Sequence, residues 1–171
     1  MAQSRIREFS SSATKIVSDA DGEVVGRTRI QKMAYLLELA GVGDGFKFSY
    51  KHYGPYSQML AESVRIAVLF NAVTEEKHQT DWGGMYSVYR ASPSDEVNAV
   101  RKQILDVTKR ANAVQLELAA TAAYLSFEGY EDAWAETSRR KPEKAQHIPG
   151  AMELYREISS LETPNGWPVV N

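Results

Sequence analysis

The clearest helical pattern in the chain lies between residues 28 and 41. Its apolar residues recur at steps of three and four, the spacing of one helix face: Ile30, Met33, Leu37 and Ala40. Thr28 followed by Gln31 has the spacing of a capping box, and Gly41 suits a helix end. We therefore predict a helix over residues 28–40.

The segments before and after this helix differ from each other in the period of their apolar residues. An earlier set of apolar residues also has helical spacing: Ile6, Phe9, Ala13, Ile16 and Val17. This predicts a first helix that ends near Ser18, with turn residues in the following DADGEVVG. From Phe46 the period changes to two, because aromatic residues at 46, 48 and 50 alternate with polar ones. A half-buried strand over 46–51 is expected.

That strand leads into the octapeptide YKHYGPYS at 50–57. Apolar residues at helical spacing follow it and predict a helix from about Pro55 to Phe70, with the proline at or just before the first turn. Ser57 suits the start of that helix. Tyr53 and Tyr56 are three positions apart across Gly-Pro, so we expect one to point towards the core and one towards solvent.

The remaining chain predicts a hairpin and then helices only. Strands over 73–77 and 85–90 are joined by a polar loop with Trp-Gly-Gly, and a helix start is expected at 92–95. A long apolar period from there to Gly129 exceeds ordinary helix lengths, and Asn112 can cap a second helix, so a break near Ala111 is favoured over one long helix.

The C-terminal part contains two further helical patterns. A short helix over 131–137 precedes the basic run 139–142, and Pro149 opens a last helix that extends to Leu161. The expected fold is α+β and mostly helical: a single domain over 1–162, with a winged-helix-like first half, a helical C-terminal half, and a tail over 163–171.

Composition narrows the function classes. The 171 residues are 43% hydrophobic, which suits one core, and 20 Lys and Arg face 22 Asp and Glu, so no global field attracts nucleic acid or a membrane surface. No cysteine is present and no apolar run approaches a membrane span. We expect a cytoplasmic protein without a membrane segment.

No pattern points to catalysis. The three histidines, His52, His78 and His147, lack the spacing of a metal site, and the glycines at 41, 43 and 45 follow a predicted helix rather than a strand, unlike a phosphate loop. No catalytic residue, metal site or cofactor is expected. The tyrosines of the octapeptide could stack a base or donate hydroxyl groups, but on the residues alone they are better explained as packing at a corner.

Four segments together resemble a known family. They are RIQKMAYL at 29–36, YKHYGPYS at 50–57, LELAATAAYL at 116–125 and RKP at 140–142. In this order they resemble the SocA-like antitoxin family, also called the Panacea domain, and more closely its YwgA-like branch. The resemblance implies a mainly helical domain that binds a protein partner, often a toxin encoded beside it, and in one branch delivers that toxin to a protease. It brings no catalytic residues.

With this resemblance, partner binding becomes as well supported as packing for the octapeptide. The predicted partner-binding residues are Tyr53, Pro55, Tyr56, Lys32 and Arg65, because rigid aromatic residues dominate contact surfaces. The partner is a protein, such as a toxin from a neighbouring gene, and the oligomeric state stays open.

A winged-helix regulator that binds nucleic acid is the alternative. Residues 55–70 would be its recognition helix and 73–90 its wing. Nucleic acid is disfavoured because the helix carries Arg65 against Glu62 and the hairpin is acidic.

Overall fold

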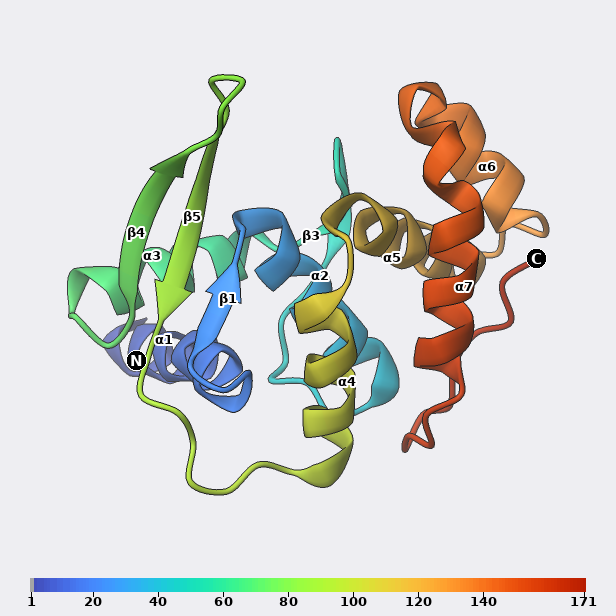
Figure 1. Ribbon diagram of the computed structural model, residues 1–171. Helices are drawn as coiled ribbons and strands as arrows, with labels where there is room; N and C mark the ends of the chain where they lie inside the picture. The colour runs from blue at the N-terminus through green and yellow to red at the C-terminus, as the bar shows by residue number, and fades with distance from the viewer. Residues whose placement is uncertain (1) are drawn as a thin grey trace.

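The N-terminal half consists of helices packed beside two small antiparallel sheets (Figure 1). The computed structural model describes residues 2–171. Its first elements are α1 (Ala2–Asp19), β1 (Glu23–Val25), α2 (Arg27–Ala40), β2 (Ser49–Lys51), β3 (Gly54–Tyr56), α3 (Gln58–Leu69), β4 (Thr74–Gln79) and β5 (Met85–Arg90).

The C-terminal half is helical throughout. It contains α4 (Ala99–Arg110), α5 (Ala113–Phe127), α6 (Ala133–Arg140), the 3-10 helix η1 (Pro142–His147) and α7 (Ile148–Ser159). The predicted α+β, mostly helical class is therefore confirmed. Among residues 2–171, no helix is long and apolar enough to cross a membrane.

The larger sheet gives the first half a winged-helix-like order. Its strands lie in the order β1-β5-β4, and Val24 of β1 is opposite Tyr89 of β5. The hairpin β4–β5 projects beyond the helices like a wing (Figure 1). The sequence predicted this hairpin but placed turn residues where β1 lies. That part of the prediction is wrong, because the partner strand of β1 lies more than sixty positions away in the sequence.

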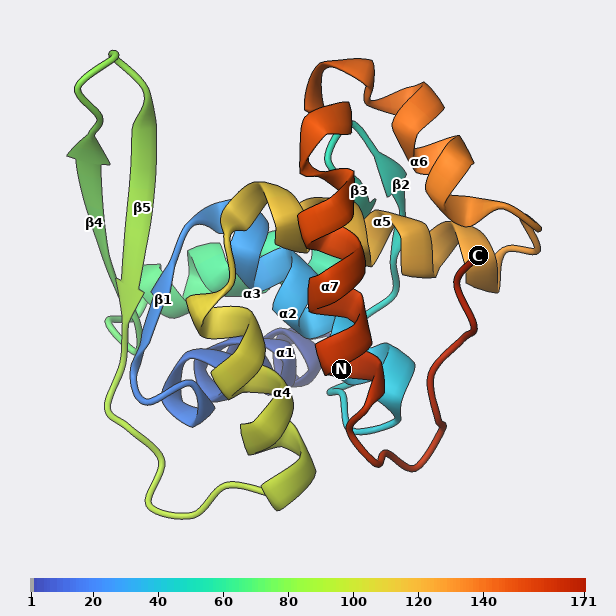
Figure 2. The same cartoon turned by 45° about the vertical axis from the view of Figure 1, so that its right-hand side comes forward.

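Helices α2 and α5 form the centre of the core. Helix α2 is buried along most of its length, and the alanines at 119, 120, 122 and 123 of α5 are fully buried. Small side chains allow neighbouring backbones to approach closely, and α5 packs against α2 on one side and α6 and α7 on the other (Figure 2).

The starts of α2 and α4 differ from the predicted ones. Helix α2 begins at Arg27 behind Gly26, whose φ is 102° and whose N–H donates to Ser87 of β5, so the Thr28 capping box does not form. Helix α4 begins only after Asn98, because the Ser94 hydroxyl donates to Asp19 at 2.6 Å and holds the preceding segment against α1.

The predicted break near Ala111 is confirmed. Ala111 has extended backbone with φ −64° and ψ 149°. The Asn112 side chain accepts hydrogen bonds from the N–H groups of Val114 at 3.0 Å and Gln115 at 3.1 Å, which starts α5 in a new direction.

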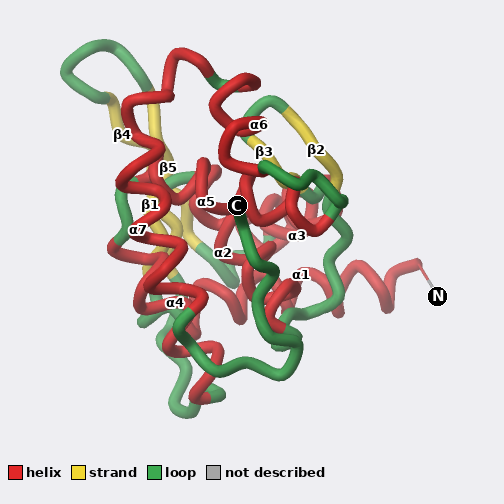
Figure 3. The backbone as a smooth tube through the Cα atoms, turned by 90° about the vertical axis from the view of Figure 1, so that its right-hand side faces the viewer, coloured by secondary structure: helices red, strands yellow, loops and turns green. Residues whose placement is uncertain are grey.

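The tail over 163–171 has no regular secondary structure but is tied to the helices (Figure 3). The Asn165 N–H donates to the Ala40 carbonyl at 3.1 Å, and the Trp134 N–H donates to the Asn171 carbonyl at 3.0 Å. The tail thereby connects the end of α2 with the start of α6.

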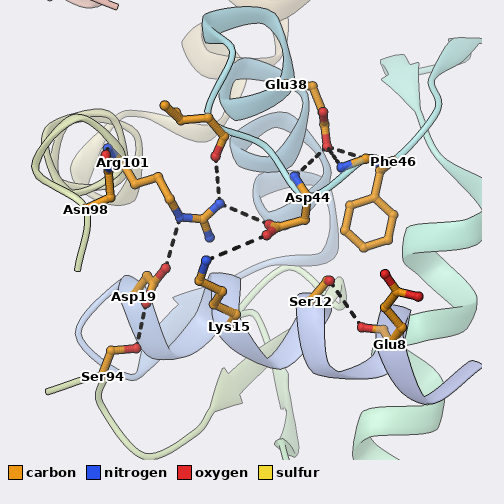
Figure 4. A network of polar contacts seen from close by, with 12 residues as sticks. Glu8, Ser12, Lys15, Asp19, Glu38, Asp44, Phe46, Ser94, Asn98 and Arg101 are labelled. Atoms are coloured by element: carbon orange, nitrogen blue, oxygen red, sulfur yellow. Dashed lines mark hydrogen bonds and ion pairs between the residues drawn. The ribbon is translucent and has the colours of Figure 1, made fainter. Parts of the chain in front are cut away.

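Buried Arg101 joins three segments that are distant in sequence (Figure 4). Its Nε donates to Asp19 at 3.0 Å, and its Nη1 donates to Asp44 at 3.0 Å and to the Val42 carbonyl at 2.9 Å. Near the end of α2, one carboxylate oxygen of Glu38 accepts the N–H groups of residues 44–46 in the following loop, at 2.8, 2.6 and 2.9 Å. These bonds hold the loop between α2 and β2.

The same loop explains a shortened strand. The predicted strand over 46–51 pairs only at Ser49–Lys51, because the N–H of Phe46 is bound by Glu38. The predicted alternation is nevertheless present: Phe46 is buried and Phe48 is half-buried against Tyr35, whereas Lys47 and Ser49 are exposed.

Replacing Arg101 by leucine should lower the free energy of unfolding by about 3–5 kcal/mol, because two buried carboxylates lose their counter-ion. The matched control is Arg110→Leu, whose exposed pair with Glu157 should contribute less than about 1 kcal/mol. Urea unfolding measures both, and equal losses would contradict a special role for Arg101.

Candidate functional site

The octapeptide is a β-hairpin rather than a link into a helix. Tyr50 pairs with Pro55 and Lys51 with Gly54, so His52 and Tyr53 form the two-residue turn. Pro55 therefore lies in β3, three residues before α3 begins, and not at or just before the first turn of α3 as predicted. Ser57 is the N-cap of α3, as predicted, and accepts the N–H of Leu60 at 3.2 Å.

Two buried side chains of α2 hold the hairpin from one side. Gln31 forms two bonds with the backbone of Ser57, donating to its carbonyl at 3.0 Å and accepting its N–H at 2.8 Å. Lys32 Nζ donates to the Pro55 carbonyl at 2.7 Å. Helix α2 thereby fixes the strand that follows the turn.

Helix α5 supports the hairpin from another side. Gly54 has φ 89°, and a Cβ built on it would lie 2.2 Å from the Thr121 hydroxyl oxygen. That hydroxyl donates to the Glu117 carbonyl at 2.7 Å, as helical threonines commonly do. Position 54 therefore requires glycine both for its backbone conformation and for its distance from α5.

A buried group of charges lies beneath the hairpin. The Glu117 carboxylate accepts hydrogen bonds from Lys141 Nζ at 2.8 Å and from Lys144 Nζ at 2.8 Å. Lys141 also donates to the His52 carbonyl in the turn at 2.7 Å. Lys32 is close enough to feel the charges of these three residues but forms no ion pair with Glu117. We call these four residues the lysine cluster.

Burial changes the proton affinity of Lys32. The side chain is 1% exposed, and this desolvation is the main cause that lowers the pKa of Lys32 to about 7. The positive charges of Lys141 and Lys144 lower it further, while Glu117 acts in the opposite direction. The charge of Lys32 therefore changes near neutral pH.

A cavity of about 580 Å³ opens beside the hairpin, between α2, α3 and β5. We call it the α2–α3 pocket. Lys32, Tyr53, Tyr56 and Arg65 all line it, so the structure brings together four of the five predicted partner-binding residues. Apolar side chains complete much of the wall: Ile30, Ala61, Val64 and Val68.

The five predicted residues differ in exposure. Tyr53 is 59% exposed at the hairpin turn, with Lys144 Nζ 5.1 Å from its ring centroid, and Arg65 is exposed and paired with Glu62 at 3.0 Å. Tyr56 is half-buried, so the two tyrosines differ in exposure as expected, although Tyr56 is not fully buried in the core. Pro55 is buried and contributes its carbonyl to Lys32 rather than a contact surface.

Sequence reasoning missed Gln31, Glu117, Thr121 and Lys141. A charged residue within the apolar run 116–125 was the available signal for Glu117. The four segments that carry the family resemblance also converge here: 29–36 supplies Gln31 and Lys32, 116–125 supplies the α5 contacts, and 140–142 supplies Lys141, all around the octapeptide.

Within residues 2–171, no three His, Cys, Asp or Glu side chains are grouped so as to hold a metal ion.

Comparison with known proteins gives one relative. The chain is similar to the uncharacterized protein YwgA of Bacillus subtilis, with 29% identity over 128 residues that cover 69% of this chain and 74% of that protein. No family model matches the chain, and no solved structure matches it. The similarity supports a YwgA-like relationship and assigns no activity.

Replacing Gly54 by alanine should destabilise the protein more than the same change at Gly45. Both glycines have φ 89°, but only position 54 faces a neighbouring side chain. Gly45→Ala should cost about 1 kcal/mol for backbone strain, and Gly54→Ala about 1–3 kcal/mol more for the clash with Thr121. Thr121→Ala should recover part of that loss in a double-mutant cycle. Equal midpoints in urea for the two alanine variants would contradict the close packing.

The free energy of unfolding should rise with pH because of Lys32. Its pKa is lowered to about 7 in the folded state, whereas an unfolded lysine has a pKa of about 10.4. Between these values the unfolded chain binds more protons, so the cost of burying the charge is fully present below pH ~7 and fades as the pH rises. Relative to Lys32→Met, the wild-type protein should gain at most about 1.4 kcal/mol per pH unit between pH ~7 and ~9. The free energies of unfolding of both proteins are measured in urea at the two pH values. A stability difference between them that does not change with pH would contradict the lowered pKa.

Proposed function

We propose that this chain is a non-enzymatic protein-binding module. It holds its partner with the α2–α3 pocket and with the β2–β3 hairpin of residues 49–56, which we call the tyrosine hairpin. The observation that carries this proposal is that Lys32, Tyr53, Tyr56 and Arg65 border one cavity. A hollow with exposed aromatic residues at its rim suits the anchor side chains of a protein partner.

The hairpin is well prepared for this role. Tyr53 presents a large ring with few rotatable bonds, and the backbone on both sides of it is held by Lys141 and Lys32. A surface that is already ordered loses little conformational entropy on binding. The exposed tyrosine is therefore the residue from which we expect most of the contact energy.

The family resemblance gives the kind of partner. SocA-like antitoxins bind a toxin encoded beside them, and in one branch deliver it to a protease. We propose that this chain binds a protein from a neighbouring gene in the same way, either neutralising it or acting as a proteolytic adaptor.

A winged-helix regulator is the second candidate, favoured by the strand order β1-β5-β4 beside α3. Its weakness is the charge at the groove. Arg65 is paired with Glu62, and Arg27 lies 3.6 Å from Glu75, so a nearby carboxylate offsets the charge of each arginine at the groove. A salt-sensitive complex with random duplex DNA at physiological salt would favour this candidate.

Replacing Tyr53 by alanine should weaken partner binding without changing the melting temperature, because the side chain is mostly exposed. Tagged wild-type protein is purified from its source cells, bound proteins are identified by mass spectrometry, and the product of the adjacent gene is tested directly. The affinity of the purified partner should fall by more than ~1 kcal/mol for Tyr53→Ala.

Tyr130→Ala is the matched control, since that tyrosine is also exposed and does not line the pocket. It should retain the partner. Equal affinities of both variants and the wild-type protein would contradict the proposed binding surface.

A further inference from the structure

Lys32 differs from every other charged residue on the wall of the α2–α3 pocket. Three cations and two carboxylates line this cavity. Arg27 is 3.6 Å from Glu75 and Arg65 is 3.0 Å from Glu62, so these four charges form two pairs. Among the residues that the structure describes, Lys32 forms no ion pair and donates only to a backbone carbonyl.

The lysine cluster does not supply the missing partner. Both oxygens of Glu117 are occupied by Lys141 and Lys144, at 2.8 to 2.9 Å. Lys32 is therefore a buried cation with an incomplete set of bonds, because an ammonium group has three donors. Burying a charge without an anion is costly, and the resulting low proton affinity of Lys32 agrees with this.

We propose that the α2–α3 pocket receives a carboxylate group of the partner protein and that Lys32 is its counter-ion. This inference rests on the proposed function and names the chemistry that the partner presents. A carboxylate can come from an acidic side chain or from a C-terminus, and both have the same charge and shape at the lysine.

Charge favours a carboxylate over a phosphate. The pocket has one unpaired cationic group, which matches one negative charge, and the two arginine–glutamate pairs on the same wall add no net positive charge for a dianion. Each arginine has a carboxylate beside it that would compete for the two-pronged contact that phosphates prefer. The apolar wall between Ile30 and Val68 suits the hydrocarbon part of the same segment.

The test uses the purified, isotope-labelled chain and three blocked dipeptides. Acetyl-Leu-Phe with a free C-terminus carries a terminal carboxylate, acetyl-Leu-Glu-amide carries a side-chain carboxylate, and acetyl-Leu-Gln-amide carries none. Backbone NMR shifts locate the site. We expect shifts at the pocket-lining residues of α2 and α3, at about tenfold lower concentration for at least one acid than for the neutral peptide. The acidic peptide that binds more tightly shows whether the carboxylate comes from a C-terminus or from a side chain.

Variants assign the effect to the lysine. Lys32→Met should remove the preference for acids, whereas Lys144→Met should retain it, because Lys144 belongs to the same cluster but does not line the pocket. The comparison of acid with amide on the wild-type protein remains valid even if Lys32→Met fails to fold. Equal affinity for acid and amide, absence of shifts at the pocket, or tighter binding of inorganic phosphate would overturn the proposal.

Failure of this inference can be told apart from failure of the proposed function. A partner captured through Tyr53 that binds Lys32→Met with unchanged affinity would contradict the carboxylate contact alone. Acid-selective peptide binding with no Tyr53-dependent protein partner would contradict the protein-binding role alone.

Discussion

The position of the tyrosine hairpin depends on side chains that bind its backbone. A two-stranded hairpin with three residues in each strand is not stable alone, and its polar groups need partners wherever they are buried. Lys32 and Gln31 bind the strand after the turn, and Lys141 binds the turn itself. Tyr53 therefore projects from a fixed platform, and every contact proposed for it depends on these bonds.

This arrangement has an energetic cost that is concentrated at one residue. Glu117 compensates Lys141 and Lys144 directly, and Lys144 is partly in contact with solvent. Lys32 has neither advantage, and burial lowers its pKa to about 7, so it holds its proton less tightly than an ordinary lysine. A leucine or methionine would fill the same space at lower cost. A costly lysine beside a cavity is therefore better explained by a ligand than by stability.

The sequence predicted those features that depend on interactions between residues close together in the chain. The break before α5 was predictable because Asn112 caps its own helix, and the face of α2 was predictable from its period. The strand β1 was not predictable, because the strand with which it pairs, β5, is distant in sequence. The register of the β2–β3 hairpin was not predictable either, because side chains of α2 hold it in place. In the same way, Tyr53 and Lys32 could be proposed from the sequence, whereas the meeting of Glu117 with Lys141 is a product of tertiary packing.

The wing provides a separate argument for a protein partner over nucleic acid. Its tip presents Trp82, 85% exposed, and Met85, 63% exposed, where a nucleic-acid wing would present cations to the phosphates. Arg90 near its base is already paired with Glu23 and Glu76. Arg65 of α3 and Arg90 of the wing thus have carboxylate partners within the fold, and large apolar side chains are exposed near the tip of the wing. A winged-helix-like domain with this surface attracts a polyanion only weakly over long distances. Its exposed apolar side chains can still pack against the surface of a protein.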